Sequence, residues 1–322
     1  MVELGYTLSS EEHPPNDLVE HAALAEDAGF DFLGISDHFH PWTTTQGESP
    51  FVWSTLGGVA RATDGIPVGV GVTCPIMRYH PANVAQATAT VADMLPGRFA
   101  LGVGTGELLN EHVLGDHWPE HAVRLEMLAE AVDVIRSLWT GEQVSHHGEH
   151  YTVQNARLFT LPDETPPVHV SAYGERAAKT AADVGDGFWC VGPQDTVETW
   201  AEAGGEGPRY TQLQMCYAET EAEAVETAHE WWPNDALPGE LSAQLPTPVH
   251  FEQACEMVSE ADIAEGSMVT SPEPEDHVES IRDAVDAGYD HVYVHQVGPN
   301  QAEFVEFYED EVFPALADAG LA

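Results

Sequence analysis

The sequence predicts an α/β protein in which eight parallel strands and their helices close into a (β/α)8 barrel. Short apolar runs alternate with longer amphipathic stretches along the whole chain, which is typical of repeated strand–helix units. Eight such runs occur in 322 residues, a length that suits one barrel. No repeat of fixed period and no linker divides the chain, so we expect a single domain over residues 1–322.

Each expected element can be read from the apolar pattern and from its stop signals. Gly29 ends the first helix, and Pro96 with Gly97 closes the third. Pro314 is expected to bend the last helix or to end it early. The expected strands are 2–6, 32–36, 68–72, 99–103, 168–171, 187–190, 212–217 and 291–295. The expected helices are 18–28, 51–62, 83–95, 121–138, 175–184, 197–203, 222–232, 251–259, 278–287 and 302–317.

Two stretches interrupt the alternation and are expected to be insertions. Residues 142–165 follow the fourth strand and predict a small hairpin around 151–153. Residues 233–247 follow the seventh strand and are rich in Pro and Gly, which predicts a loop. A doubly wound sheet is the alternative fold, but it needs a glycine-rich turn after the first strand. Residues 7–10 contain no glycine.

The charge is strongly acidic, with 10 basic and 55 acidic residues and a net charge of −45. Nucleic acids and anionic membranes are therefore excluded as partners, because both require a basic surface. Lys179 is the sole lysine, and the acidic residues are spread over the whole chain. Concentrated salt screens such repulsion, which predicts a salt-rich cytoplasm, as in a halophilic archaeon. An ordinary acidic cytosolic protein is the alternative.

The cysteines and the N-terminus indicate a reduced cytoplasmic location. Four widely spaced cysteines fit neither a zinc knuckle nor a disulfide framework. The chain begins with an expected strand and not with a signal peptide, and no apolar run reaches the ~20 residues that span a bilayer.

Candidate catalytic residues follow the second and fourth strands. Asp37 and His38 end the second strand, Trp42 follows them, and Glu107 follows the fourth. Barrel active sites lie at these carboxyl ends, so the side chains are expected to meet. A histidine accepts protons at neutral pH, and a carboxylate can orient it or bind substrate. Alternatively, Asp37 caps a turn and His38 is a satisfied polar residue.

Glycines mark two possible ligand positions. Gly102, Gly104 and Gly106 end the fourth strand, where missing side chains would let a ligand approach the backbone. Gly174 precedes the helix at 175–184, whose free amides could bind an anion. Ordinary barrel packing and a plain turn are the alternatives.

A metal site is not expected, although His38 and His40 form a His-x-His pair. Metal-dependent barrel hydrolases carry that pair on the first strand and an aspartate at a late strand end. Here the pair follows the second strand, and the eighth ends in His295. The first insertion contains three further histidines, which we expect in a solvated loop and not as metal ligands: His146, His147 and His150.

The strand-end motifs resemble one known family. Asp-His-Phe-His-Pro-Trp at 37–42, Arg-Tyr-His-Pro at 78–81 and Gly-Val-Gly-Thr-Gly-Glu at 102–107 resemble the coenzyme F420-dependent oxidoreductases. That family is a branch of the luciferase-like superfamily and includes dehydrogenases of sugar phosphates and of secondary alcohols. The resemblance extends over nearly the whole chain.

The resemblance implies a cofactor and a division of roles. Coenzyme F420 carries a hydride at C5 and a proton at N1. His38 would take the proton of a substrate hydroxyl, Glu107 would supply the N1 proton, and Trp42 would shape the pocket. A non-prolyl cis bond would fall at Gly71–Val72. The implied cofactor-binding residues are Asp37, Gly71, Val72, Cys74 (in place of a threonine), Thr105, Gly106, Asn110, Ser171, Ala172, Tyr173, Gly174, Glu175 and Arg176.

The departures from the family point to the substrate. Sugar-phosphate dehydrogenases of the family hold the phosphate with basic residues and a threonine, where this chain has Val191, Gln194 and Ala-Glu-Gly at 264–266. A phosphate dianion needs cationic partners. We therefore expect an uncharged alcohol, aldehyde or ketone. The family suggests a homodimer. An FMN-dependent monooxygenase and a metal-dependent hydrolase remain alternatives.

Overall fold

Eight parallel strands form a closed barrel, as the alternation predicts. The structure is a computed structural model and describes residues 2–237 and 241–321. The barrel order is β1-β10-β9-β8-β7-β4-β3-β2, and β1 pairs with β10 to close it. The strands are β1 (Glu3–Leu8), β2 (Phe32–Ile35), β3 (Val68–Thr73), β4 (Phe99–Val103), β7 (Val168–Ser171), β8 (Gly187–Val191), β9 (Arg209–Met215) and β10 (His291–Gln296).

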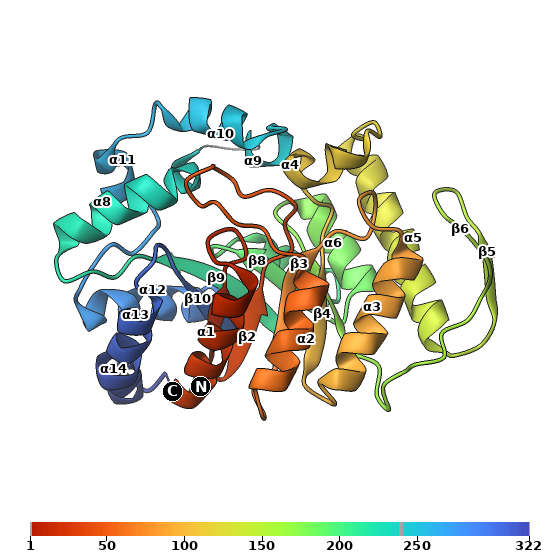
Figure 1. The fold of residues 1–322 in the computed structure, drawn as a ribbon, viewed down its shortest axis with the longest axis horizontal. Coiled ribbons are helices and arrows are strands. Elements are labelled where there is room, and N and C mark those ends of the chain that lie inside the picture. Colours follow the sequence, from red (N-terminus) through yellow and green to blue (C-terminus); the bar gives the residue numbers. More distant parts are fainter. Residues whose placement is uncertain (1, 238–240, 322) are drawn as a thin grey trace.

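Helices cover the outside of the barrel and begin near the carboxyl ends of the strands (Figure 1). Their bounds lie within a few residues of those expected from the sequence. The main helices are α1 (Pro15–Ala28), α2 (Val52–Ala62), α3 (Pro81–Met94), α5 (His121–Trp139), α6 (Glu175–Val184), α7 (Thr196–Glu202), α8 (Glu221–Trp231), α10 (Pro248–Cys255) and α12 (Pro274–Asp286). No helix in the described part of the chain is long and apolar enough to cross a membrane.

Aromatic side chains fill the inside of the barrel. Trp189 stacks on Tyr210 with ring centroids 4.4 Å apart, and its indole N–H donates to the Tyr293 hydroxyl at 2.6 Å. A Cβ atom at Gly69 or Gly71 would lie 2.8 or 2.5 Å from the Trp189 ring. These glycines therefore make room for the indole, and the filled interior leaves the carboxyl ends of the strands as the place for a ligand.

The first insertion is a hairpin, as expected, with β5 (Val144–His147) antiparallel to β6 (Thr152–Ala156). The second is not simply a loop, because η2 (Pro233–Ala236) and α9 (Leu241–Gln244) lie within it, and residues 238–240 fall outside the described chain. The sequence also missed α4 (Leu108–Glu111), η1 (His112–Leu114) and α11 (Glu260–Ala264). Elements of three to five residues are too short to show a helical period.

Helices α8, α10 and α11 lie on the side of the carboxyl ends of the strands, toward the top of Figure 1, and are together called the lid below.

The last helical segment continues past Pro314, which was expected to bend it or to end it early. A π-helical turn, η3 (Tyr308–Val312), joins α13 (Gln301–Phe307) to α14 (Phe313–Asp318). Pro314 lies in the first turn of α14, where a backbone N–H is not needed. The expectation of an early end was therefore wrong. The Val2 amide donates to the Leu321 carbonyl at 2.8 Å, which ties the two ends of the chain together.

Candidate active site

Asp37 is buried at the end of β2 and is held by three donors. Its Oδ1 accepts from Arg78 Nη2 at 3.1 Å and from the Tyr79 hydroxyl at 3.2 Å. Its Oδ2 accepts from the Thr73 hydroxyl. A buried carboxylate is stable only when it is paired and hydrogen-bonded in this way. Asp37 thus fixes the position of the neighbouring His38, and its expected contact with a cofactor ring stays a prediction.

Glu111, on α4, is a second buried acid that contacts Arg78. Its Oε2 accepts from the Arg78 amide at 2.8 Å, and its Oε1 lies 3.5 Å from Arg78 Nε. Burial raises the pKa of Glu111 to about 7, although Arg78 opposes that rise. Sequence reasoning gave this residue no role, because nothing local indicates its burial.

His38 pairs with a carboxylate that the sequence analysis missed. His38 Nδ1 lies 3.1 Å from the His40 carbonyl oxygen, so that nitrogen carries a hydrogen. His38 Nε2 lies 3.3 Å from Glu11 Oε1. A positive charge on the His38 ring would therefore have a carboxylate partner, which favours a histidine that takes up a proton.

Glu11 is ionised in its buried position because its surroundings favour the charge. Burial alone raises its pKa, but His38 and a hydrogen bond from Ser36 outweigh burial, so the pKa of Glu11 lies below its usual value. The Ser36 hydroxyl donates to Glu11 Oε2 at 2.5 Å. The signal for Glu11 in the sequence is an acidic pair just after the first strand, beside Glu12.

Trp42 lies next to His38, as expected. Their ring centroids are 4.9 Å apart. The Trp42 amide donates to Gln46 Oε1 at 2.8 Å, and its ring meets Phe251 of α10 edge-on at 5.1 Å. The indole is therefore held between the base and the lid, and shields one side of His38 from water.

Glu107 and Asn110 follow β4 and connect to the His38 segment. Asn110 Oδ1 accepts from the amides of Phe39 and His40 at 2.9 and 3.2 Å. Its Nδ2 lies 3.5 Å from Glu107 Oε2. Thr105 and Glu107 are both partly exposed in this loop. The structure thus brings the expected acid and base segments to one end of the barrel.

The glycines after β4 serve packing more directly than ligand access. A Cβ at Gly102 would lie 2.0 Å from the Val70 carbonyl oxygen. Gly106 has a φ of 70°, and its Cβ would lie 2.6 Å from Cys74 Sγ. Protein atoms, and not open space, therefore occupy those two positions. Cys74 is 5% exposed, and burial raises the pKa of its thiol.

The bond between Gly71 and Val72 is cis, as the family resemblance implied.

The segment from Ser171 to Arg176 joins β7 to α6 and leaves room for an anion. A Cβ at Gly174 would meet nothing within 4 Å, and no side chain caps the amides of α6. Arg176 is exposed and forms no ion pair within the described residues. Glu175 instead pairs with Lys179 at 2.5 Å. Ala172 is buried, whereas Tyr173 is 57% exposed with its hydroxyl accepting from the Val191 amide.

The two histidines of the His-x-His pair bind different partners. His40 Nδ1 lies 2.9 Å from the Leu109 carbonyl oxygen, whereas His38 Nε2 faces Glu11. Across residues 2–237 and 241–321, no group of three or more His, Cys, Asp or Glu side chains is placed to hold a metal ion.

The fold and the site together describe an enzyme with an acid–base pair at the carboxyl end of a parallel barrel, and comparison with known proteins defines its class. Residues 2–291 match the luciferase-like monooxygenase family, so the chain belongs to that family.

Its similar relatives include two enzymes named F420-dependent glucose-6-phosphate dehydrogenase. The protein from Beutenbergia cavernae is 36% identical over 330 residues, which cover 98% of each chain. The protein from Intrasporangium calvum is 36% identical over 333 residues, which cover 98% of this chain and 99% of the relative. The solved structure of an F420-dependent secondary alcohol dehydrogenase with an F420-acetone adduct superposes with a TM-score of 0.90. It is 31% identical and covers 98% of this chain and 99% of that one.

Proposed function

We propose that this protein is a coenzyme F420-dependent oxidoreductase that transfers a hydride between C5 of the deazaflavin and an alcohol or carbonyl substrate. The observation that carries the proposal is the Glu11–His38 pair beside Trp42, at the end of the barrel where enzymes of this fold act. Relatives that cover the whole chain and are named F420-dependent enzymes support the same cofactor.

The residues at this end of the barrel fit such a cofactor. The open N-terminus of α6 at Gly174, with Arg176 beside it, suits a phosphate group. The loop with Thr105, Gly106 and Asn110 would hold the ring system near His38. When bound, the deazaflavin would supply the hydride acceptor or donor.

The protein's own residues would manage the protons. His38 would accept the proton of the substrate hydroxyl, and the Glu11 carboxylate beside its ring would stabilise the positive charge that forms there. Glu107 would supply the proton for N1 of the cofactor, and the Asn110 side-chain amide, 3.5 Å from Glu107 Oε2, helps to position its carboxyl group. Trp42 excludes water from the base.

We further propose that the substrate is uncharged and is not a sugar phosphate. The Arg78 guanidinium next to the site is already paired with Asp37 and Glu111, and this supports the proposal because two carboxylates already face its charge. Relatives named for glucose 6-phosphate make this a sharp test. Purified protein with F420 should oxidise 2-propanol or 2-butanol and leave glucose 6-phosphate unchanged, and turnover of the sugar phosphate would sink this part of the proposal.

Cofactor identity can be tested by tryptophan-fluorescence titration with F420, FMN and NADP in multimolar KCl. We expect F420 alone to bind. Arg176→Gln should weaken F420 binding by about tenfold, the value of one lost charge-assisted contact. Lys179→Gln, on the same helix and paired with Glu175, is the matched control and should leave binding unchanged. Binding of FMN in place of F420 would move the protein to the monooxygenases.

We also propose a homodimer in a salt-rich cytoplasm. A net charge of −45 should make the folded state more stable as KCl rises, because salt screens the self-repulsion. Light scattering and thermal unfolding over a KCl series test both points. A monomer, or a melting temperature that salt does not raise, would count against them.

A further inference from the structure

The chain between β2 and α2 carries Trp42 and contacts the lid. Residues 42–46 make these contacts and are called the Trp42 loop below. The Trp42 ring meets Phe251 of α10 edge-on. The amide and the hydroxyl of Thr44 both donate to Glu252 Oε1, which is also on α10. The Trp42 loop is therefore attached to a lid helix that lies more than 200 residues away in the sequence.

Gln46 joins the Trp42 loop to a second part of the lid with both ends of its side-chain amide. It is 2% exposed, and its Oε1 accepts from the amides of Trp42 and Thr43 at 2.8 and 3.3 Å. Its Nε2 donates to the carbonyl oxygen of Trp231, which ends α8, at 3.0 Å and to Oδ1 of Asn234 in η2 at 3.1 Å. Three of these partners are backbone groups with fixed roles, so only this orientation of the amide satisfies them.

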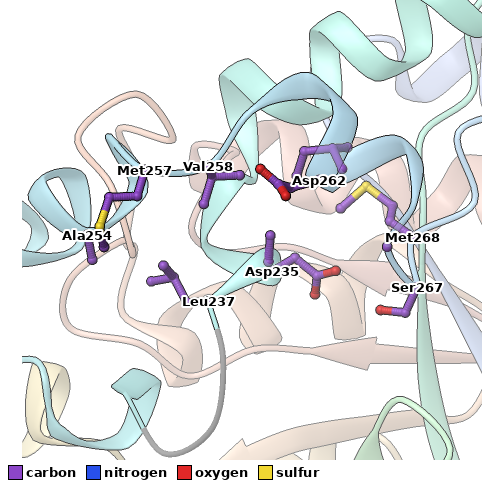
Figure 2. A pocket seen from close by; sticks show the side chains of 11 residues that line it. Asp235, Leu237, Ala254, Met257, Val258, Asp262, Ser267 and Met268 are labelled. Atoms are coloured by element: carbon purple, nitrogen blue, oxygen red, sulfur yellow. The ribbon is translucent and has the colours of Figure 1, made fainter.

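The lid is incompletely packed beside these contacts. A cavity of about 410 Å³ lies between η2, α10 and α11 (Figure 2). Ala254 of α10 and Leu237, which follows η2, are among the residues that line it. Side chains that line a cavity lack protein neighbours on that side and lose the dispersion attraction of packed atoms. The bonds to the Trp42 loop are therefore part of what fixes η2 and α10 above the barrel.

The contacts of Gln46 reach the candidate base through Trp42. The Trp42 ring centroid lies 4.9 Å from that of His38. Gln46 Oε1 binds the backbone at 42 and 43, which sets the point from which the indole extends toward His38. A displacement of about 1 Å at a reacting site can cost about 100-fold in rate. The backbone position that Gln46 fixes is therefore one to which catalysis at His38 would be sensitive.

We propose that Gln46 is a positioning residue of the active site, which ties the Trp42 loop to the lid and so holds the Trp42 indole against His38. This inference rests on the proposed function, in which Trp42 excludes water from the base. None of the four hydrogen bonds of Gln46 goes to His38, to Glu107 or to a residue proposed to bind the cofactor. Loss of these bonds should therefore impair the reaction at His38 and leave F420 binding unchanged.

Gln46→Met tests the proposal, because it keeps the length of the side chain and removes all four hydrogen bonds. With a secondary alcohol and F420, kcat/KM should fall by about 10- to 100-fold, whereas the dissociation constant of F420 should stay within about twofold.

Gln301→Met is the matched control. Gln301 is also 2% exposed, accepts from the Tyr6 hydroxyl and donates to the Gln296 carbonyl oxygen at 2.9 Å, so its partners lie outside the Trp42 loop and the lid. This variant should lose stability and keep kcat/KM within about twofold. Equal losses of kcat/KM in the two variants would overturn the proposal, since the effect would then come from lost stability.

A double-mutant cycle tests whether Gln46 acts through Trp42. Trp42→Ala removes the indole that Gln46 is proposed to hold, so addition of Gln46→Met to that variant should change kcat/KM by less than about twofold. A further tenfold loss would overturn the proposal. If Gln46→Met does not fold, Asn234→Ala carries the same test, because it removes only one of the two lid acceptors. It should lower kcat/KM by about threefold in the wild-type background and by less than about 1.5-fold beside Trp42→Ala.

A measurement without cofactor or substrate separates this proposal from the proposed function. In the cofactor-free protein, Gln46→Met should speed hydrogen exchange of the amides at 42 and 43 by about tenfold and weaken the nuclear Overhauser effect between the Trp42 and His38 rings, whereas Gln301→Met should change neither.

Each combination of results has one meaning. Unchanged exchange and an unchanged ring contact in Gln46→Met would overturn the positioning role whatever the activity. Wild-type kcat/KM in Gln46→Met would overturn that role and leave the proposed function standing. If exchange and ring contact change as expected but no form of the protein oxidises an alcohol with F420, the proposed function fails and the placement of Trp42 by Gln46 stands.

Discussion

Glu11→Gln is the most direct test of the proposed base. The substitution keeps the side chain's size and an oxygen that can accept from Ser36, but it removes the charge 3.3 Å from His38 Nε2. At that separation the attraction is about 5 kcal/mol before desolvation is counted, with an effective dielectric constant of about 20. Desolvation offsets part of that attraction, which leaves about 1.4–4 kcal/mol to stabilise the charge that forms on His38. We therefore expect kcat/KM to fall by about 10- to 1000-fold.

The assay is the oxidation of a secondary alcohol, followed by reduction of F420 between pH 5 and 9. Without the carboxylate, the positive charge that forms on His38 is less stabilised, so kcat/KM should fall across this pH range. The dissociation constant of F420 should stay within about twofold, because Glu11 contacts His38 and not the proposed cofactor residues.

Glu12→Gln is the matched control for this substitution. Glu12 is the adjacent buried acid, but it pairs with His295 at 2.6 Å and not with His38. Both variants should lose stability, whereas kcat/KM should fall by the expected factor in Glu11→Gln alone. If Glu11→Gln keeps the wild-type kcat/KM, or if Glu12→Gln lowers it by the same factor, Glu11 does not assist His38 in the reaction and its contact with His38 is only structural.

The remaining predictions concern stability. The pKa of Glu111 is raised to about 7, so the folded state keeps a proton that the unfolded chain releases above about 4.5, and stability is lost as pH rises through that window. Between pH 4.5 and 7.5 the free energy of unfolding of the wild type should fall by on the order of 3 kcal/mol relative to that of Glu111→Gln, measured by urea unfolding in KCl. A difference between the two proteins that does not change with pH would contradict this. Gly106→Ala and Gly115→Ala both place alanine at positive φ, but only the first brings a Cβ within 2.6 Å of the Cys74 sulfur. Gly106→Ala should cost about 1–3 kcal/mol more than Gly115→Ala in thermal unfolding, and equal losses would show that strain at positive φ, and not the contact with Cys74, dominates.

The sequence determined the barrel and the segments that carry the site. Strand and helix periods are local properties, so the alternation predicts β1 to β10 and the hairpin at 142–165 without knowledge of distant contacts. The rule that barrel sites lie at strand ends then selects His38, Trp42 and Glu107. The segments of His38 and Glu107 were expected to lie together, and Asn110 contacts both of them.

Only the tertiary structure decided which groups the buried ionisable side chains contact and how burial shifts their pKa values. Glu11 and His38 are 27 residues apart, and no local pattern pairs them across β1 and β2. The raised pKa values of Glu111 and of the Cys74 thiol depend on how completely other elements exclude water. The physical reason is that strand and helix periods depend on residues close in sequence, whereas desolvation and ion pairing depend on groups that meet only after the barrel has closed.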